Sequence, residues 1–321
     1  MRARQACLVC LQNQAENVCK MLHTSHAKDI AQAINKKLSH FKDAKDTAQN
    51  PNSPITQPLY PPQIAISIYA YLAAALGVED PFLHIKQESM VRANAIINNL
   101  LARYSPPELK YIESSTESQA QYSLDSITQR LDWAVRMAIL GNVIDYGSQS
   151  AFSFEHADFG FESMQFGIFD IQAFAKALDS AQSLLYLADN AGENIFDKVL
   201  IHTLKIIYPN LRIYYALRGR AIINDLTLAD MAHPLAQDMQ KFCTLLDSGV
   251  RSPGFVYDDA NAKTRAIYDS ASVILAKGMG NFECLESSKD KRLFLLFKVK
   301  CDVVAHFCGV QKGMMMFKHN V

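Results

Sequence analysis

Residues 183–193 read SLLYLADNAGE, and this stretch decides the fold. Ser183–Leu187 is a short apolar run bounded by polar residues, which is typical of a buried strand rather than a helix. Asp189–Glu193 then reads as a turn, and apolar residues recur at helical spacing from Phe196 to Ile207. A strand that passes through a turn into a helix is the repeating unit of α/β proteins.

Further apolar runs downstream predict the rest of the sheet. Strands are expected at Leu211–Ala216, Ser272–Ala276 and Leu293–Val299, with a short fifth element at Val303–Ala305. Alternation of strand, turn and helix implies a largely parallel sheet with helices on both faces. We therefore assign residues 151–321 to a three-layer α/β/α domain.

The first half of the chain is mainly helical in its pattern. Helices are expected over about 1–42, over 64–76 with Gly77 as a C-cap, from Asp80-Pro81 to about Leu100, and over 124–140. A proline-rich segment within residues 51–62 reads as a long surface loop. Residues 1–150 are thus predicted to form a helical N-terminal region that packs on the α/β domain.

Composition restricts the class of partner. The 32 basic and 32 acidic residues give a formal net charge of +0, whereas proteins that bind nucleic acid usually carry a basic excess.

No run approaches the ~18 apolar residues needed to cross a bilayer, and the apolar run at Ala6–Leu11 is shorter than a signal-peptide core of ~7–15 residues. Seven cysteines without dense spacing fit a reducing compartment. We expect a cytoplasmic protein that binds a small molecule; the sequence does not predict its oligomeric state.

Polar residues follow four of the predicted strands. They are Asp189-Asn190, Asn224-Asp225, Lys277–Glu283 and Lys298–Lys300. In an open α/β sheet, ligands bind beyond the carboxyl ends of the strands. Two carboxylates, an amide and a lysine are therefore expected on one rim.

These residue types suit metal-assisted hydrolysis of a phosphate ester. Carboxylate and amide oxygens are hard ligands for Mg²⁺ or Mn²⁺. The helix that starts after Gly192 favours an anion, and Lys277 is placed to reach phosphate oxygens. The nucleophile is either metal-bound water or a carboxylate. Taken alone, each feature also has a structural interpretation, because Asp189 can cap a helix and Gly278-Met279-Gly280 can be a tight turn.

The motifs resemble those of one known family. Leu187–Asp197 is similar to the signature of the DUF89 family of damage-control phosphatases, and Arg218–Asp225, Lys277–Glu283 and Lys298–Ala305 resemble its later motifs in order. The 141–147 run Gly-Asn-Val-Ile-Asp-Tyr-Gly and the pair Cys7/Cys10 resemble its prokaryote-type branch.

The resemblance implies an activity and a set of site residues. It implies divalent-metal-dependent hydrolysis of phosphate monoesters, such as sugar phosphates or damaged phosphometabolites, with Mg²⁺, Mn²⁺, Co²⁺ or Ni²⁺. Asp189, Asn190 and Asp225 would be the metal ligands, and Asp189, Asp225 and Lys277 the catalytic residues, with Lys277 facing the phosphate. The residues expected to contact substrate are Gly192, Glu193, Arg218, Asn281, Asn142 and Asp145, of which Asn142 and Asp145 either border the pocket or cap a turn.

Other functions fit the pattern less well. A non-catalytic sensor of sugar phosphates or nucleotides is the main alternative, although a sensor need not keep three oxygen ligands. The glycine fingerprint of dinucleotide-binding folds does not follow any predicted strand. Cys7 and Cys10 are interpreted as buried helix cysteines, or as part of a soft-metal or redox site.

Overall fold

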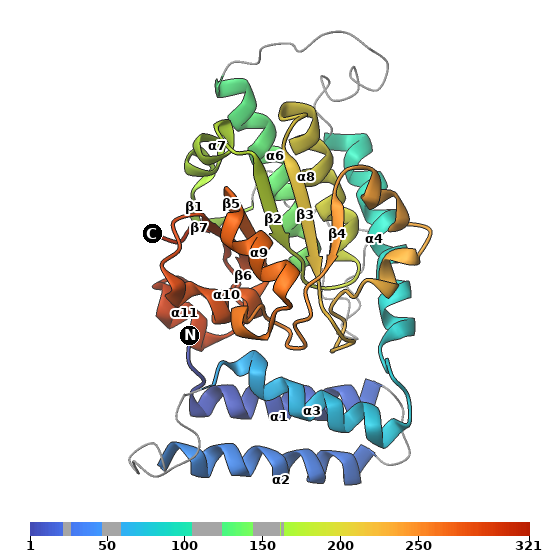
Figure 1. Ribbon diagram of the computed structural model, residues 1–321. Helices are drawn as coiled ribbons and strands as arrows, with labels where there is room; N and C mark the ends of the chain where they lie inside the picture. Colours follow the sequence, from blue (N-terminus) through green and yellow to red (C-terminus); the bar gives the residue numbers. More distant parts are fainter. Residues whose placement is uncertain (22–26, 47–58, 105–123, 144–160, 162–163) are drawn as a thin grey trace.

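A seven-stranded mixed sheet forms the centre of the molecule (Figure 1). The computed structural model describes residues 1–21, 27–46, 59–104, 124–143, 161 and 164–321. The strand order is β1-β7-β6-β5-β2-β3-β4; strands β2 to β6 run parallel to one another, β7 is antiparallel to β6, and β1 is parallel to β7. The strands are β1 (Phe166–Phe169), β2 (Ser183–Leu187), β3 (Arg212–Leu217), β4 (Thr244–Asp247), β5 (Val273–Lys277), β6 (Leu293–Lys298) and β7 (Met315–His319).

Helices cover both faces of this sheet. Side chains alternate between the two faces of a strand. Accordingly, Leu184 and Tyr186 enter one core while Leu185 and Leu187 enter the other. The first core contains α4 (Leu83–Tyr104), α6 (Leu124–Val143), α7 (Ile171–Asp179) and α8 (Glu193–Ile207); the second contains α9 (Ala262–Ser270), α10 (Met279–Leu285) and α11 (Asp302–Cys308). The predicted three-layer α/β/α fold is confirmed.

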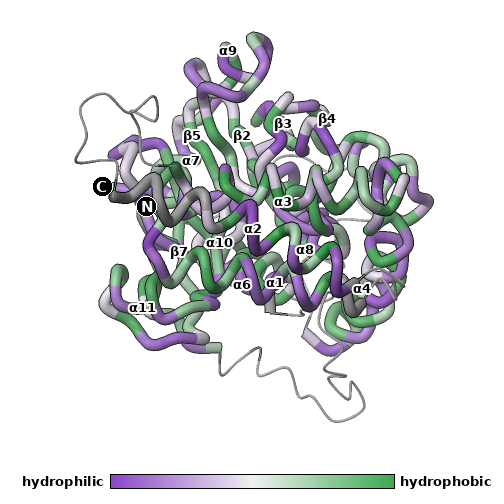
Figure 2. Tube along the Cα trace, turned by 90° about the horizontal axis from the view of Figure 1, so that it is seen from below, coloured by the Kyte–Doolittle hydropathy of each residue, from purple (hydrophilic) through white to green (hydrophobic). Residues whose placement is uncertain are grey.

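Three N-terminal helices form a separate layer. They are α1 (Gln5–Met21), α2 (Ala27–Asp46) and α3 (Pro61–Leu76), and they share a core of their own. In Figure 1 this layer lies across one end of the sheet, and Figure 2 views it from below, where hydrophilic and hydrophobic residues alternate along its helices. Gly77 ends α3 with a φ of 67°, as the C-cap prediction requires.

The predicted N-terminal region divides between two cores. Helices α4 and α6 pack on the sheet with α8, whereas α1, α2 and α3 pack on one another. The boundary predicted near residue 150 lies outside the described residues. Within the described part of the chain, the helical layer with its own core therefore consists of α1 to α3.

Some elements differ from the sequence prediction. Strands β1 and β4, four residues each, and β7 were not expected; β1 and β4 are the short, partly exposed edges of the sheet and carry little apolar signal. Val303–Ala305 belongs to helix α11, because the Cys301 side chain accepts the Val304 N–H at its start and Gly309 ends it with a φ of 67°.

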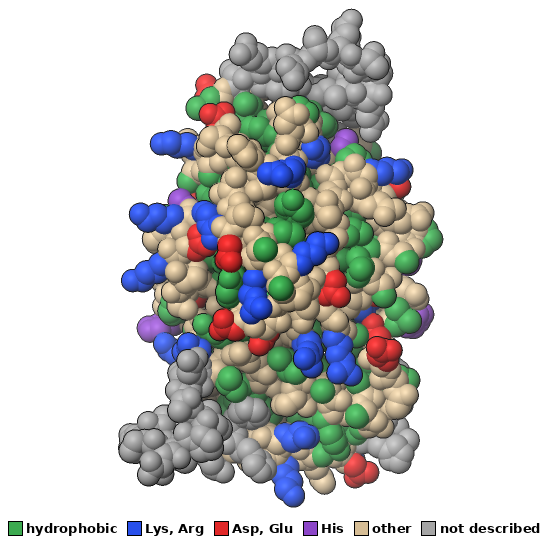
Figure 3. Space-filling model, viewed as in Figure 1, with side chains coloured by type: hydrophobic (Ala, Val, Ile, Leu, Met, Phe, Trp, Pro, Cys, Tyr) green, Lys and Arg blue, Asp and Glu red, His purple; other side chains and the backbone are tan. Residues whose placement is uncertain are grey.

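Two features concern the kind of molecule that the protein could contact: the mixture of charges on its surface and the length and apolar character of its helices. Figure 3 shows basic and acidic side chains interspersed over the described part of one face. Among the helices of the described residues, none has both the length and the apolar character required to span a bilayer.

Candidate active site

A cleft of about 920 Å³ separates the helical layer from the sheet. Its floor includes Asp189, Asn190, Asn224, Asp225 and Lys300, and its opposite wall comes from α1 and α3. Asp189 follows β2, beside β5, where the chain switches from one half of the sheet to the other. Such switch points at the carboxyl ends of strands are the usual ligand sites of α/β sheets.

Two loops meet at the floor of the cleft. The Ala191 N–H donates to the Asn224 carbonyl at 2.8 Å, and the Leu226 N–H donates to the Asp189 carbonyl at 3.0 Å. These bonds place Asn190 opposite Asp225 as an isolated bridge. The three predicted metal ligands are thus brought together, although 35 residues lie between the first and the last in the sequence.

The helical layer anchors the second of these loops. Ile222 is buried in the core of α1, α2 and α3, and Ile223 packs against that core. Ile223 has a φ of 46°, in the left-handed region that a β-branched residue rarely adopts. Such strained backbone persists only where its surroundings enforce it. Packing on the helical layer therefore helps to fix the position of Asp225.

Arg218 links the two carboxylates from beneath. Its Nε donates to Asp225 Oδ1 at 2.7 Å, and its Nη2 lies 3.9 Å from Asp189 Oδ1. The same guanidinium donates to Asn281 Oδ1 at 3.2 and 3.3 Å. Because all these groups are buried, the hydrogen bond from Arg218 holds the Asp225 carboxylate in place, and the same guanidinium lies within ion-pair distance of Asp189.

Two amides hold the other side of Asp189. The side chains of Asn142 and Asn190 donate to Asp189 Oδ2, at 3.3 and 3.1 Å. Both amides also donate to Glu193, at 2.9 to 3.0 Å. Glu193 therefore orients the amides, and the amides orient Asp189.

Lys277, which is predicted to face the phosphate, is not among the residues that line the cleft. Its side chain is completely buried, and Nζ contacts Asp197 Oδ1 at 2.5 Å and Glu193 Oε2 at 3.1 Å. The hydroxyls of Tyr186 and Tyr215 donate to the same Asp197 carboxylate at 2.7 Å each. These five residues, Tyr186, Glu193, Asp197, Tyr215 and Lys277, are called the buried network below. Strand β5 is buried along its whole length, so its last side chain points into the core instead of the cleft.

The buried charges are not balanced. Four carboxylates, those of Asp189, Glu193, Asp197 and Asp225, surround two cations, Arg218 and Lys277. Burial raises the pKa of Asp189 well above its usual value, and the charges of Glu193 and Asp225 raise it further, against Arg218 and Lys300. With all four carboxylates ionised, this cluster would carry an excess of two negative charges, which a divalent cation would neutralise.

Three oxygen atoms of residues that line the cleft accept no hydrogen bond from another described residue that would compete with such a cation. The hydrogen bonds to Asp189 all reach Oδ2, and the one to Asp225 reaches Oδ1. The Asn190 side chain uses its nitrogen as donor. Among the described residues, Asp189 Oδ1, Asp225 Oδ2 and Asn190 Oδ1 therefore accept no hydrogen bond, and all three residues line the cleft. Such hard oxygen ligands fit Mg²⁺ or Mn²⁺.

Apart from this set, the described residues contain no cluster of the side chains that most often bind metal ions. In that part of the chain, no group of three or more His, Cys, Asp or Glu side chains has an arrangement that would hold a metal ion. A site at Asp189 thus depends on two carboxylates and an amide oxygen, with the remaining positions open to water or substrate.

The residues predicted to contact substrate mostly support the site from below. Glu193, Arg218, Asn281 and Asn142 are buried and do not line the cleft. Asn281 accepts the Phe255 N–H at 2.7 Å, and the Gly192 N–H donates to Asn194 Oδ1 at 2.9 Å, so neither group is open to a phosphate. Asp145 lies outside the described residues.

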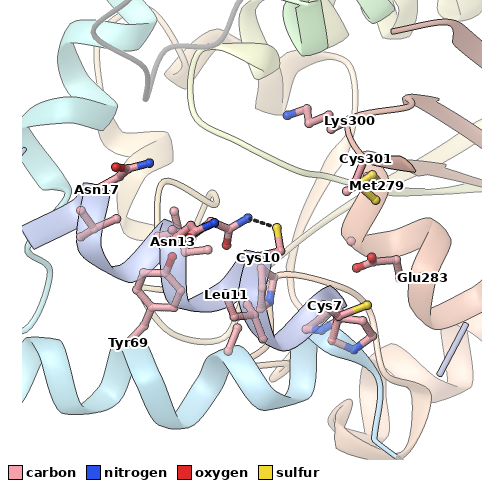
Figure 4. Close-up of a pocket in the computed structure, with 18 of the residues that line it drawn as sticks. Cys7, Cys10, Leu11, Asn13, Asn17, Tyr69, Met279, Glu283, Lys300 and Cys301 are labelled. Atoms are coloured by element: carbon pink, nitrogen blue, oxygen red, sulfur yellow. Dashed lines mark hydrogen bonds between the residues drawn. The ribbon is translucent and has the colours of Figure 1, made fainter. Parts of the chain in front are cut away.

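Sequence reasoning missed the contribution of α1. Cys10, Asn13 and Asn17 lie on the side of α1 that faces the cavity, with Lys300, Cys301 and Met279 on the opposite wall (Figure 4). Cys7 is buried as expected, but Cys10 is exposed to the cleft. The sequence feature that could have indicated this contribution is the lack of charged residues on one face of α1.

The Asp189 carboxylate lies so close to residue 278 that only glycine fits there. The φ of Gly278 is +88°, and a Cβ at this position would lie 2.0 Å from Asp189 Oδ2. We expect Gly278→Ala to displace Asp189 and to lower any activity of the site on the order of a hundredfold, the usual effect of a 1 Å misplacement. Steady-state assays would measure it. Gly309→Ala is the matched control, because Gly309 also has a positive φ, +67°, but nothing lies within 4 Å of its added Cβ. Equal losses in both variants would mean that backbone strain, and not the carboxylate, is responsible.

Comparison with known proteins identifies the family. Residues 3–316 match the model of the damage-control phosphatase ARMT1-like domain. The chain is 28% identical to a damage-control phosphatase of Pyrococcus horikoshii, with 100% of this chain and 99% of that protein covered. It is 33% identical to a damage-control phosphatase of Archaeoglobus fulgidus over 79% of this chain and 81% of that protein.

A solved structure agrees with these relatives. The crystal structure of a DUF89 family protein from Pyrococcus horikoshii superposes with a TM-score of 0.75 at 27% identity and covers 100% of both chains. The resemblance seen in the sequence motifs is thereby confirmed, and it supports a phosphatase role.

Proposed function

The chain belongs to the damage-control phosphatase ARMT1-like family, and from this premise we propose that it is a divalent-metal-dependent phosphatase of small phosphate monoesters. The observation that carries the proposal is the set of three oxygens on Asp189, Asn190 and Asp225 that accept no hydrogen bond from another described residue, beside a group of buried carboxylates that outnumber the buried cations. Sugar phosphates and damaged phosphometabolites are the substrates that the family resemblance implies.

Each residue has a task in this proposal. Asp189, Asn190 and Asp225 would hold a divalent ion, which when bound would polarise the phosphoryl group and offset its charge. Arg218 fixes Asp225 by a hydrogen bond and pairs with Asp189 at 3.9 Å, and Glu193 fixes the amides. Lys300 lies on the floor of the cleft, and its charge already acts on Asp189, so it is the lysine placed to meet phosphate oxygens there. Lys277 supports the site through Glu193.

The test is phosphate release from a panel of monoesters. The protein would be treated with a chelator, and Mg²⁺, Mn²⁺, Co²⁺ or Ni²⁺ would then be added back singly. We expect release only when a metal is restored. Binding of metal and of phosphate esters without release under any condition would instead support a non-catalytic sensor of sugar phosphates or nucleotides.

A further inference from the structure

One face of α1 is exposed and yet carries no charge. Cys10, Asn13, Gln14 and Asn17 recur at helical spacing, are exposed, and line the cleft. A neighbouring side of the helix, with Leu8, Leu11, Ala15 and Val18, packs in the core of the helical layer. The cleft face of α1 is defined here as these four residues, Cys10, Asn13, Gln14 and Asn17.

The neighbouring helix shows what an ordinary exposed face looks like. Lys28, Asp29, Lys36 and Lys37 of α2 are all exposed. Exposed helix positions are usually charged in this way. The cleft face of α1 differs from this pattern, because its exposed side chains are a thiol and three neutral amides.

Two of the amides are open to a ligand. Gln14 Nε2 contacts Cys10 Sγ at 3.7 Å. No hydrogen bond joins the side chain of Asn13 or Asn17 to another described residue. Figure 4 shows both on the wall of the cavity opposite Lys300. An amide offers two donors and an acceptor, which is the pattern that pairs with alcohol groups.

We propose that Asn13 and Asn17 are specificity-determining residues, which bind hydroxyl groups of the substrate while its phosphate lies at Asp189, Asp225 and Lys300. This inference rests on the proposed phosphatase function. The cleft volume of about 920 Å³ exceeds the needs of a phosphate group and falls within the range of small-molecule sites, roughly 300–1,000 Å³. The space between the floor and α1 thus accommodates the organic part of an ester.

The experiment compares two kinds of ester in one double variant. Asn13→Ala/Asn17→Ala should fold, because both positions are exposed and alanine favours helix; thermal unfolding would check this. KM and kcat would be measured with the best hydroxylated ester found for the wild type and with p-nitrophenyl phosphate, whose body has no hydroxyl group. We expect KM for the hydroxylated ester to rise about tenfold, the effect of losing two hydrogen bonds, with KM for the aryl ester unchanged.

A control variant and the pattern of results distinguish a failure of this inference from a failure of the proposed function. Gln12→Ala changes an amide on α1 that does not line the cleft, and it should leave both values unchanged. An unchanged or equal effect on the two esters in the double variant would overturn the inference, as would a wild type that hydrolyses only the aryl ester. A wild type that releases phosphate from no ester would instead refute the proposed function.

Discussion

Replacing Asp225 with asparagine should lower metal affinity and metal-dependent phosphate release by more than about a hundredfold. Loss of a hydrogen-bonded partner outside the ligand shell of a metal typically costs 10–100-fold. Asp225→Asn removes a proposed ligand oxygen together with its charge, so its effect should be larger. The shape of the side chain is kept, and the amide oxygen can still accept from Arg218. Metal titration and steady-state assays would measure the two effects.

Asp302→Asn is the matched control for this change. Asp302 also lines the cleft, but its side chain is 88% exposed and lies 3.8 Å from Lys312. We expect Asp302→Asn to change metal affinity by less than about threefold, as is typical for an exposed charge. If Asp225→Asn kept wild-type metal affinity, the assignment of Asp225 as a ligand would be wrong.

Replacing Lys277 with methionine should destabilise the protein by about 3–5 kcal/mol, the usual cost of removing one partner from a buried ion pair. The substitution removes the ammonium that Asp197 and Glu193 share, while methionine keeps most of the volume. Burial acts to lower the pKa of Lys277, but Asp197 and Glu193 raise it above its usual value, so the lysine stays charged. Urea unfolding at pH 7 would measure the loss of unfolding free energy.

A surface lysine supplies the comparison for Lys277→Met. Lys198 is partly exposed and lies 4.0 Å from Asp238. Lys198→Met should change the unfolding free energy by less than about 1 kcal/mol. Equal stability of the Lys277 variant and the wild type would show that the buried network does not depend on this lysine.

The parts of the fold that the sequence predicted are those with strong local patterns. Strands β2, β5 and β6 are buried almost throughout and read as unbroken apolar runs. Edge strands β1 and β4 are half exposed and only four residues long, so their pattern is weak. Strand β7 pairs antiparallel to β6, which no local signal near Met314–Met316 indicates.

The candidate site shows the same division between local and tertiary information. Position at a strand end was enough to bring Asp189, Asn190 and Asp225 together. It was not enough to tell which side chains face the cleft: Lys277 ends its strand inside the core, and Lys300 lies on the cleft floor. The role of Asn13 and Asn17 depends on how α1 packs across the sheet end, and this is tertiary information.

The most direct test of the central claim is a parallel titration of metal binding and phosphate release in the wild type and in Asp189→Ala. Chelated protein would be titrated with Mn²⁺ in a calorimeter and, over the same concentrations, in an assay with the best monoester. We predict that wild-type activity rises in step with occupancy of a single metal site, and that Asp189→Ala loses both. Wild-type activity without metal, or unchanged metal affinity in Asp189→Ala, would contradict the account.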